Sequence, residues 1–274
     1  MRSKLFGVLV CLLGFGLIAF AGDFPVTVTK IVVDGNISIK TTDILDLVAF
    51  NEGDEVTSQM LKEASQAIYD LGWFSDVIPD ISDAGTLTFK VTENPVVENI
   101  EIAGNTNTEG FTLFGITFFR VPIMTTSKAR SLLRENGVKT GKVLNNNSLT
   151  NGLQAIMDAY ENKGYVLVSI GNVEAKNTLS IQIIEGRVTG NVVTGLSTVP
   201  ESVALDMIDL PLGECLKASY IQQVMVRLQA SVYFSGVDVR AQQGATADSV
   251  RLSWSLDERR LIAVSYTHLR AHET

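Results

Sequence analysis

Residues that could carry out catalysis are scarce in this chain of 274 residues. Histidine is the side chain most often recruited as a general base or a zinc ligand. The two histidines, His268 and His272, both lie near the C-terminal end. No HExxH, GxSxG or GxxxxGK[ST] motif occurs. The sequence therefore predicts that the protein is not an enzyme and has no catalytic residue, no metal ligand and no cofactor.

Two acid pairs and one cysteine are the remaining candidates for reactive groups. Asp257 next to Glu258, and Asp206 near Asp209, have the residue types of a hydrolytic carboxylate pair. We interpret them instead as solvated strand ends and helix faces. Cys215 has no neighbouring base that would activate its thiol, so its sequence context indicates core packing rather than a nucleophile.

The N-terminal end has the parts of a secretory signal peptide. Arg2 and Lys4 precede an apolar run that reaches Phe20, and a small residue, Ala21, follows it. The run is shorter than the roughly 20 residues that a membrane-spanning helix needs. We therefore expect residues 1–21 to be cleaved off on export, the alternative being a retained membrane anchor.

The C-terminal residues 264–274 resemble the translation of an adapter used in sequencing libraries, the alternative being a genuine basic tail. Without residues 1–21 and 264–274, 19 Lys and Arg remain against 29 Asp and Glu, a net charge of −10. An acidic balance of this size disfavours nucleic acid as a partner. It also disfavours attachment to anionic lipid through charge.

One pattern of strands and helices occurs three times along the chain. Each pass begins with a β-branched run ending near a glycine, continues through two apolar helical stripes, and closes with two alternating strands. Gly72 and Gly164 each end a second helix, and each stands 21 residues before an acid, Glu93 or Glu185. Such equal spacing predicts repeated modules of the order β-α-α-β-β at residues 24–93, 96–186 and 187–258. The linkers between them are short, which indicates limited hinging.

The apolar positions of these patterns predict the core of each module. In the last strand of each module, alternate residues share one face, and in each second helix residues three or four apart form one stripe. The expected core residues are Leu87, Phe89 and Val91 with Leu61, Ala64, Ile68 and Leu71; Leu179, Ile181 and Ile183 with Leu149, Leu153, Ile156 and Tyr160; and Val250, Leu252, Trp254 and Leu256 with Ile221, Val224 and Leu228.

The modules resemble the POTRA domain. The features that carry the resemblance are the strand ending in Gly-Asn, the two helices, an aromatic residue after a helix-ending glycine, and a hairpin that closes on an acid. Tandem POTRA domains behind a signal peptide are similar to the Omp85 superfamily, which includes the BamA-type outer-membrane protein assembly factors. The resemblance implies an α+β fold in which a three-stranded mixed sheet packs on two helices.

The resemblance also implies a function and a location. In this family the POTRA array faces the periplasm and precedes an outer-membrane β-barrel, which we expect to be missing from this sequence by truncation. The implied partners are unfolded outer-membrane proteins, accessory proteins of an assembly complex, and the outer membrane itself. Alternatives are a two-partner secretion or translocation-assembly transporter, a POTRA-bearing division scaffold, and a soluble chaperone.

The implied binding sites are the sheet edges after each second helix. An exposed edge can bind an extended peptide through main-chain hydrogen bonds, which is called β-augmentation. The expected edges are residues 75–81, 165–173 and 234–241. The alternative is that these edges bind no peptide and are protected against pairing, as Pro79 in the first edge would suggest. The second edge is favoured because its run lacks proline. Its predicted partner-binding residues are Tyr165, Val166, Leu167, Val168, Ser169 and Ile170.

An insertion at residues 106–124 interrupts the second module. Its length and its phenylalanines suggest a loop that contacts a substrate, a neighbouring module or the barrel. The equally open alternative is a local hairpin whose phenylalanines pack on the module's own sheet. The residues concerned are Phe111, Phe114, Phe118 and Phe119.

Overall fold

The computed structural model describes residues 24–113 and 116–259. The predicted signal peptide and the predicted adapter-derived tail lie outside the described residues. The chain divides into two compact units, which are described separately. One unit contains the residues up to Lys163 together with Val168–Glu185, and the other contains Gly164–Leu167 and the residues from Gly186 onward.

The first unit begins with one β-α-α-β-β module. Its elements are β1 (Val26–Thr27), β2 (Lys30–Asp34), α1 (Thr41–Leu45), β3 (Glu55–Val56), α2 (Ser58–Asp70), β4 (Phe74–Ile81) and β5 (Thr86–Glu93). The main sheet has the order β2-β5-β4, in which β2 is parallel and β4 antiparallel to β5. A small two-stranded sheet joins β1 to β3.

The local sequence explains why these elements form. The side chain of Thr57 accepts the backbone N–H of Met60 at 3.3 Å and so caps the start of α2. Leu61 and Ile68 lie on one face of α2 and are fully buried. They pack in the same core as Leu87 and Phe89 of β5. The core of the module therefore lies between the helices and one face of the sheet.

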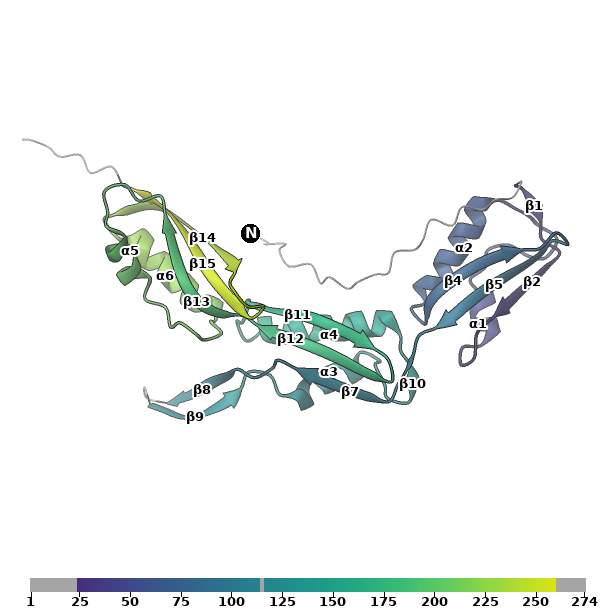
Figure 1. Ribbon diagram of the computed structural model, residues 1–274, viewed down its shortest axis with the longest axis horizontal. Helices are drawn as coiled ribbons and strands as arrows, with labels where there is room; N and C mark the ends of the chain where they lie inside the picture. Colours follow the sequence, from purple (N-terminus) through teal and green to yellow (C-terminus); the bar gives the residue numbers. More distant parts are fainter. Residues whose placement is uncertain (1–23, 114–115, 260–274) are drawn as a thin grey trace, which may run out of the picture. The chain divides into compact units, whose positions relative to one another are not determined.

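The second module completes the first unit. Its elements are β6 (Val96–Val97), β7 (Asn99–Ala103), β8 (Thr108–Leu113), β9 (Ile116–Pro122), α3 (Thr126–Glu135), β10 (Lys142–Val143), α4 (Asn146–Glu161), β11 (Val168–Ala175) and β12 (Thr178–Glu185). The sheet order is β11-β12-β7, and α3 and α4 cover one side of it (Figure 1). The insertion forms a separate β8-β9 hairpin.

The second unit contains the third copy of the element order. Its elements are β13 (Arg187–Thr194), α5 (Glu201–Ile208), α6 (Ala218–Ala230), β14 (Phe234–Gln243) and β15 (Ser249–Glu258). The sheet order is β13-β15-β14, with β13 parallel and β14 antiparallel to β15. Leu252, Trp254 and Leu256 of β15 are buried in its core. The predicted α+β class, with three-stranded mixed sheets packed on two helices, is confirmed.

A glycine after the first main strand is required in every copy. These glycines have φ of +93°, +89° and +89°, in a region that side chains with a Cβ rarely adopt. A Cβ at each position would also collide with a carbonyl oxygen of the last strand of the same module. The glycine and carbonyl pairs are Gly35 with Val91, Gly104 with Ile183, and Gly195 with Leu256.

Candidate functional site

Each main sheet has the strand after its second helix at one edge. In the three sheets these strands are β4, β11 and β14. One side of an edge strand carries N–H and C=O groups without a partner strand, so it can pair with an added strand. The three edges differ in how continuous they are, and this difference decides which of them suits an extended peptide.

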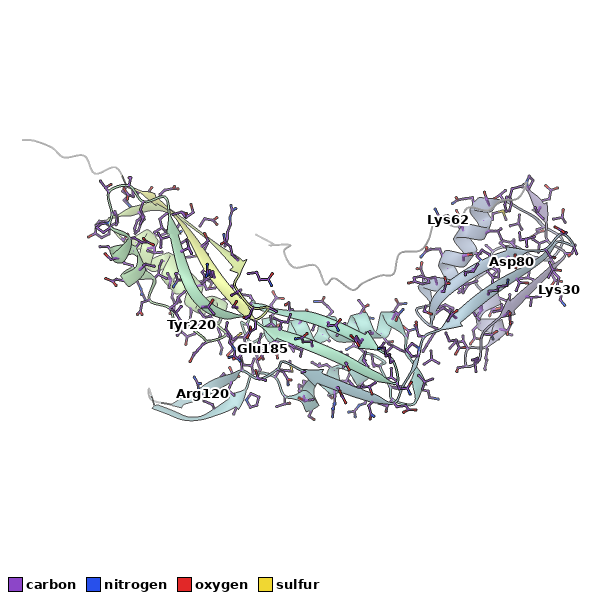
Figure 2. The ribbon with its side chains drawn as sticks, in the orientation of Figure 1. Lys30, Lys62, Asp80, Arg120, Glu185 and Tyr220 are labelled. Carbon is purple, nitrogen blue, oxygen red and sulfur yellow. The ribbon has the colours of Figure 1, made fainter. Side chains whose placement is uncertain are left out.

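The β4 edge is interrupted. Its pairing with β5 shifts register between Phe74 and Asp76, and Pro79 lies within the strand. Proline has no N–H to donate, so it breaks the row of main-chain groups. Asp80 also forms an exposed ion pair with Lys90 at 2.7 Å, and Figure 2 labels Asp80 on this strand.

The β11 edge is divided into two short parts. Val168–Ile170 pair regularly with β12, the register shifts, and pairing resumes at Val173. Gly171 and Asn172 occupy the irregularity. A bulge of this kind bends a strand and leaves residues outside the ladder. The proline-free run is therefore not a continuous edge.

Three of the six predicted binding residues lie outside β11. Val168, Ser169 and Ile170 begin the strand, whereas Tyr165, Val166 and Leu167 precede it. Tyr165 is buried and forms an isolated antiparallel bridge with Lys217, whose Nζ lies 5.3 Å from the ring centroid. The carbonyl of Leu167 accepts the N–H of Gly186 at 2.7 Å. The expectation that the edge strand starts at Tyr165 is corrected: the strand starts at Val168, because local contacts occupy Tyr165 and Leu167.

The β14 edge is the longest uninterrupted one of the three. Gly236–Gln243 pair without a shift along β15, and the irregularity at Ser235 lies at the strand's start. The stretch contains no proline. Val237 and Val239 are half-buried against the core, while Asp238 and Arg240 form an exposed ion pair at 3.1 Å. The sequence favoured the β11 edge because its run lacks proline, which is equally true of β14, and the bulge in β11 cannot be read from residue type.

The insertion hairpin is held at its base. The N–H of Ile123 donates to the carbonyl of Asn107 at 3.0 Å, and Lys163 Nζ donates to the carbonyl of Ile123 at 2.6 Å. Lys163 also pairs with Glu109 at 3.3 Å. Figure 1 shows β8 and β9 extending away from the main sheet of the module.

Three of the four phenylalanines of the insertion lie in the strands of the hairpin. Phe114 lies outside the described residues. Phe111 and Phe119 are register partners in the ladder, and Phe118 lies next to Phe119 in β9. The proposed contacts of these residues stay predictions.

A carboxylate at the end of the last strand binds the loop after the first strand in each module. In the first module, Glu93 Oε1 accepts the N–H groups of Ile37, Ser38 and Ile39 at 2.7, 2.7 and 2.9 Å. Burial by itself would raise the pKa of Glu93. The three backbone N–H bonds together outweigh burial, and the pKa of Glu93 lies below its ordinary value.

The same arrangement occurs in the second module. Glu185 Oε2 accepts the N–H groups of Thr106 and Asn107 at 2.9 and 2.7 Å, and Oε1 accepts the hydroxyl of Tyr160 at 2.8 Å. Figure 2 labels Glu185 at the end of β12. This carboxylate is buried.

Glu258 completes the set in the third module. Its carboxylate accepts the N–H groups of Ser197, Thr198 and Val199 at 2.8 to 2.9 Å, as well as both hydroxyls of Ser197 and Thr198. The Thr198 hydroxyl and then the backbone N–H groups lower the pKa of Glu258 strongly. Glu258 ends β15, as the sequence indicates, but its carboxylate is bound by loop residues some sixty positions earlier, which the local sequence does not reveal. We call the contacts of Glu93, Glu185 and Glu258 the carboxylate brackets.

The described residues contain no group of three or more His, Cys, Asp or Glu side chains that could hold a metal ion. The thiol of Cys215 is half-buried. Across residues 24–113 and 116–259, no helix is both long and apolar enough to cross a membrane. Within the described residues, the edges and the brackets are the features that recur in all three modules.

A family model described as "POTRA: Surface antigen variable number repeat" matches residues 26–94 and, a second time, residues 95–186. The chain belongs to the POTRA family. POTRA domains are not an enzyme family, which agrees with the carboxylates having structural partners. The predicted tandem POTRA domains are confirmed for residues 26–94 and 95–186.

The POTRA chain resembles proteins of outer-membrane assembly. It is 26% identical over 193 residues to the outer membrane protein assembly factor BamA of Nitratidesulfovibrio vulgaris, covering 64% of this chain and 22% of that protein. The chain thus spans about a fifth of the length of this relative.

Two solved structures share the fold. One is the N-terminal domain of Omp85 from Thermosynechococcus elongatus, with 22% identity, a TM-score of 0.58, and coverage of 88% of this chain and 100% of that one. The other is POTRA1-3 of the periplasmic domain of Omp85 from Anabaena, with 21% identity, a TM-score of 0.63, and coverage of 88% and 98%.

Proposed function

We propose that this POTRA array is the periplasmic substrate-binding and scaffolding region of an outer-membrane β-barrel assembly factor. It holds extended segments of unfolded barrel proteins by β-augmentation. The observation that carries the proposal is the uninterrupted β14 edge, Gly236–Gln243, in a fold whose edge strand recurs in every module. The named function of the N. vulgaris relative supports the same role.

The chemistry of an edge suits a varied set of substrates. An added strand gains main-chain hydrogen bonds whatever its sequence, because the N–H and C=O groups are the same in every residue. Side chains then adjust affinity according to the face on which they lie. At β14 one face offers the half-buried Val237 and Val239, and the other offers the charges of Asp238 and Arg240. A strand with apolar and polar residues in alternation matches both faces, and barrel strands have this pattern.

The interrupted edges have a secondary role in this proposal. The Val168–Ile170 stretch of β11 offers only a short ladder before the register shift. Pro79 limits β4 in a similar way. The first two modules therefore act mainly as scaffold, and β14 provides the main site for an extended segment.

The proposal is tested by titrating the chain with a barrel-strand peptide and with two N-methylated versions of it. Methylation of the odd residues removes the N–H donors on one edge of the peptide, and methylation of the even residues removes those on the other, while the side chains stay the same. We expect one version to lose binding and the other to keep it, because only one edge of the peptide pairs with β14. Equal binding by all three peptides would mean that side chains, not strand addition, hold the substrate.

A further inference from the structure

The second module contains a cleft lined by positive charge. The cleft has a volume of about 490 Å³ and lies between α3 and the start of β7. Its lining residues are Asn99, Ile100, Arg130, Arg134, Val138, Lys139 and Thr140. Three of them are cations, although the whole chain has a net charge of −8.

The fold holds these cations at the cleft. Ala129 and Leu133 are buried, so Arg130 and Arg134, which are four residues apart on α3, share the exposed side of the helix. Gly137, with φ of +97°, then turns the chain, and the N–H of Val138 donates to the carbonyl of Leu133 at 3.0 Å. This turn brings Lys139 and Thr140 back beside the helix.

The three cleft cations, Arg130, Arg134 and Lys139, have no carboxylate partner among the residues that the structure describes. Arg134 lies in the last turn of α3, where a cation stabilises the helix dipole. That effect does not explain Arg130, one turn earlier, or Lys139, beyond the helix. Three unpaired cations around one concavity attract an anion that carries more than one charge.

We propose that this cleft binds a phosphate group, either as a soluble phosphate compound or as a phosphorylated lipid headgroup. Guanidinium groups donate paired hydrogen bonds to phosphate oxygens, and an ammonium adds a point charge. The Thr140 hydroxyl and the Asn99 amide supply neutral donors at the same cleft. A phosphate monoester carries close to two negative charges at neutral pH. A single carboxylate carries one and would compensate three cations less well. The site is separate from the β14 edge and does not depend on the proposed function.

The test uses the whole chain at low ionic strength with two phosphate sources. Inorganic phosphate is titrated while the amide signals of Arg130, Arg134, Lys139 and Thr140 are followed by NMR. Vesicles of phosphatidylcholine with and without phosphatidic acid are then sedimented with the protein. We expect phosphate to shift these signals, and added salt to weaken its binding because the attraction is electrostatic. Binding to phosphatidic acid vesicles in addition identifies a lipid headgroup as the source, and binding of phosphate alone identifies a soluble ligand.

A charge-matched pair of variants gives the decisive comparison. The double variant Arg130→Gln/Arg134→Gln removes two cations from the cleft, and Lys62→Gln/Lys128→Gln removes two exposed cations that do not line it. Losing two charge-assisted contacts is expected to weaken phosphate binding about tenfold or more, whereas the control keeps the affinity of the original chain. Equal weakening by both variants would show attraction to net charge only and would overturn the proposal. Tighter binding of a penta-glutamate peptide than of phosphate would also overturn it.

Discussion

The carboxylate of Glu185, at the end of β12, accepts the hydroxyl of Tyr160, on α4, at 2.8 Å. Both side chains are buried, and the second oxygen of Glu185 accepts two N–H groups from the loop after β7. One carboxylate therefore connects the second helix, the last strand and the loop after the first strand. The brackets at Glu93 and Glu258 connect the last strand to the corresponding loop in the other two modules.

Replacing Glu185 tests how much a bracket stabilises its module. Glu185→Ala removes the shared acceptor of the Tyr160 hydroxyl and of two N–H groups, and losing a charged acceptor at a buried site is costly. We expect the free energy of unfolding to fall by about 2–4 kcal/mol, measured by urea denaturation. Glu101→Ala, at an exposed position in the same sheet, serves as the control. A similar loss of unfolding free energy in both variants would show that the bracket stabilises the module no more than an exposed carboxylate does.

The third bracket predicts a dependence of stability on pH. The pKa of Glu258 is lower in the folded protein than its ordinary value of 4.5, chiefly because of the Thr198 hydroxyl and the backbone N–H groups. When the pKa of a carboxyl group is lower in the folded protein than in the unfolded chain, its ionised form stabilises the fold. This stabilisation is complete above the unfolded-state pKa and is lost as the pH falls towards the folded-state pKa. Glu258→Gln should therefore lower the melting temperature at pH 7, and the difference from the original chain should shrink as the pH falls below 4.5.

The control for this measurement is Glu201→Gln, which removes an exposed carboxylate from the same module. A Glu258→Gln difference that stays constant from neutral to acid pH would contradict a role for the ionised bracket. Thermal unfolding followed by circular dichroism at several pH values is sufficient.

The glycine turns allow two costs of an alanine substitution to be measured separately, the backbone strain of a positive φ and the steric collision of the added Cβ. Gly35 and Gly53 have similar φ, +93° and +100°, but a Cβ at Gly35 would collide with the carbonyl of Val91, whereas nothing lies within 4 Å of a Cβ at Gly53. Both alanine variants carry the cost of positive φ, roughly 1 kcal/mol. We expect Gly35→Ala to cost clearly more than Gly53→Ala in urea denaturation. Equal costs would show that the loop moves freely away from β5.

The sequence alone was sufficient to predict the repeated order of elements and most of the core, although Leu71, Leu149, Ile221 and Val250 are only half-buried. Leu87, Phe89, Trp254 and Leu256 are buried as their alternation predicts, because burial on one face of a strand depends on local period. Leu153, Ile156 and Tyr160 are also buried as predicted, because residues three or four apart lie on the same face of a helix.

Features that depend on distant partners could not be predicted. The role of Glu258 requires the loop at Ser197–Val199, which the fold alone brings close. Tyr165 looks like the start of a strand, but its bridge to Lys217 removes it from β11. The bulge at Gly171 likewise arises from strand pairing, and the cationic cleft arises from the way α3 and the turn after it pack beside β7.

Asn94 shows how the first unit is held together at the end of β5. It is buried, and its Nδ2 donates to the carbonyls of Gly72 and Leu144, both at 2.9 Å. Asn94→Ala removes both bonds at once and should lower the free energy of unfolding by about 1–3 kcal/mol. Asn172→Ala, which removes an exposed bond to Glu174, should change it little. Equal effects would mean that solvent replaces the Asn94 bonds.

Strand addition at β14 is tested most directly by amide hydrogen exchange, measured residue by residue with and without a saturating barrel-strand peptide. Successive residues of a strand direct their N–H groups to opposite sides, so only alternate amides of Gly236–Gln243 face the open edge. We predict that these alternate amides become protected when the peptide binds and that their neighbours, already paired with β15, change little. Binding that leaves the exchange of every amide in Gly236–Gln243 unchanged would contradict β-augmentation at this edge.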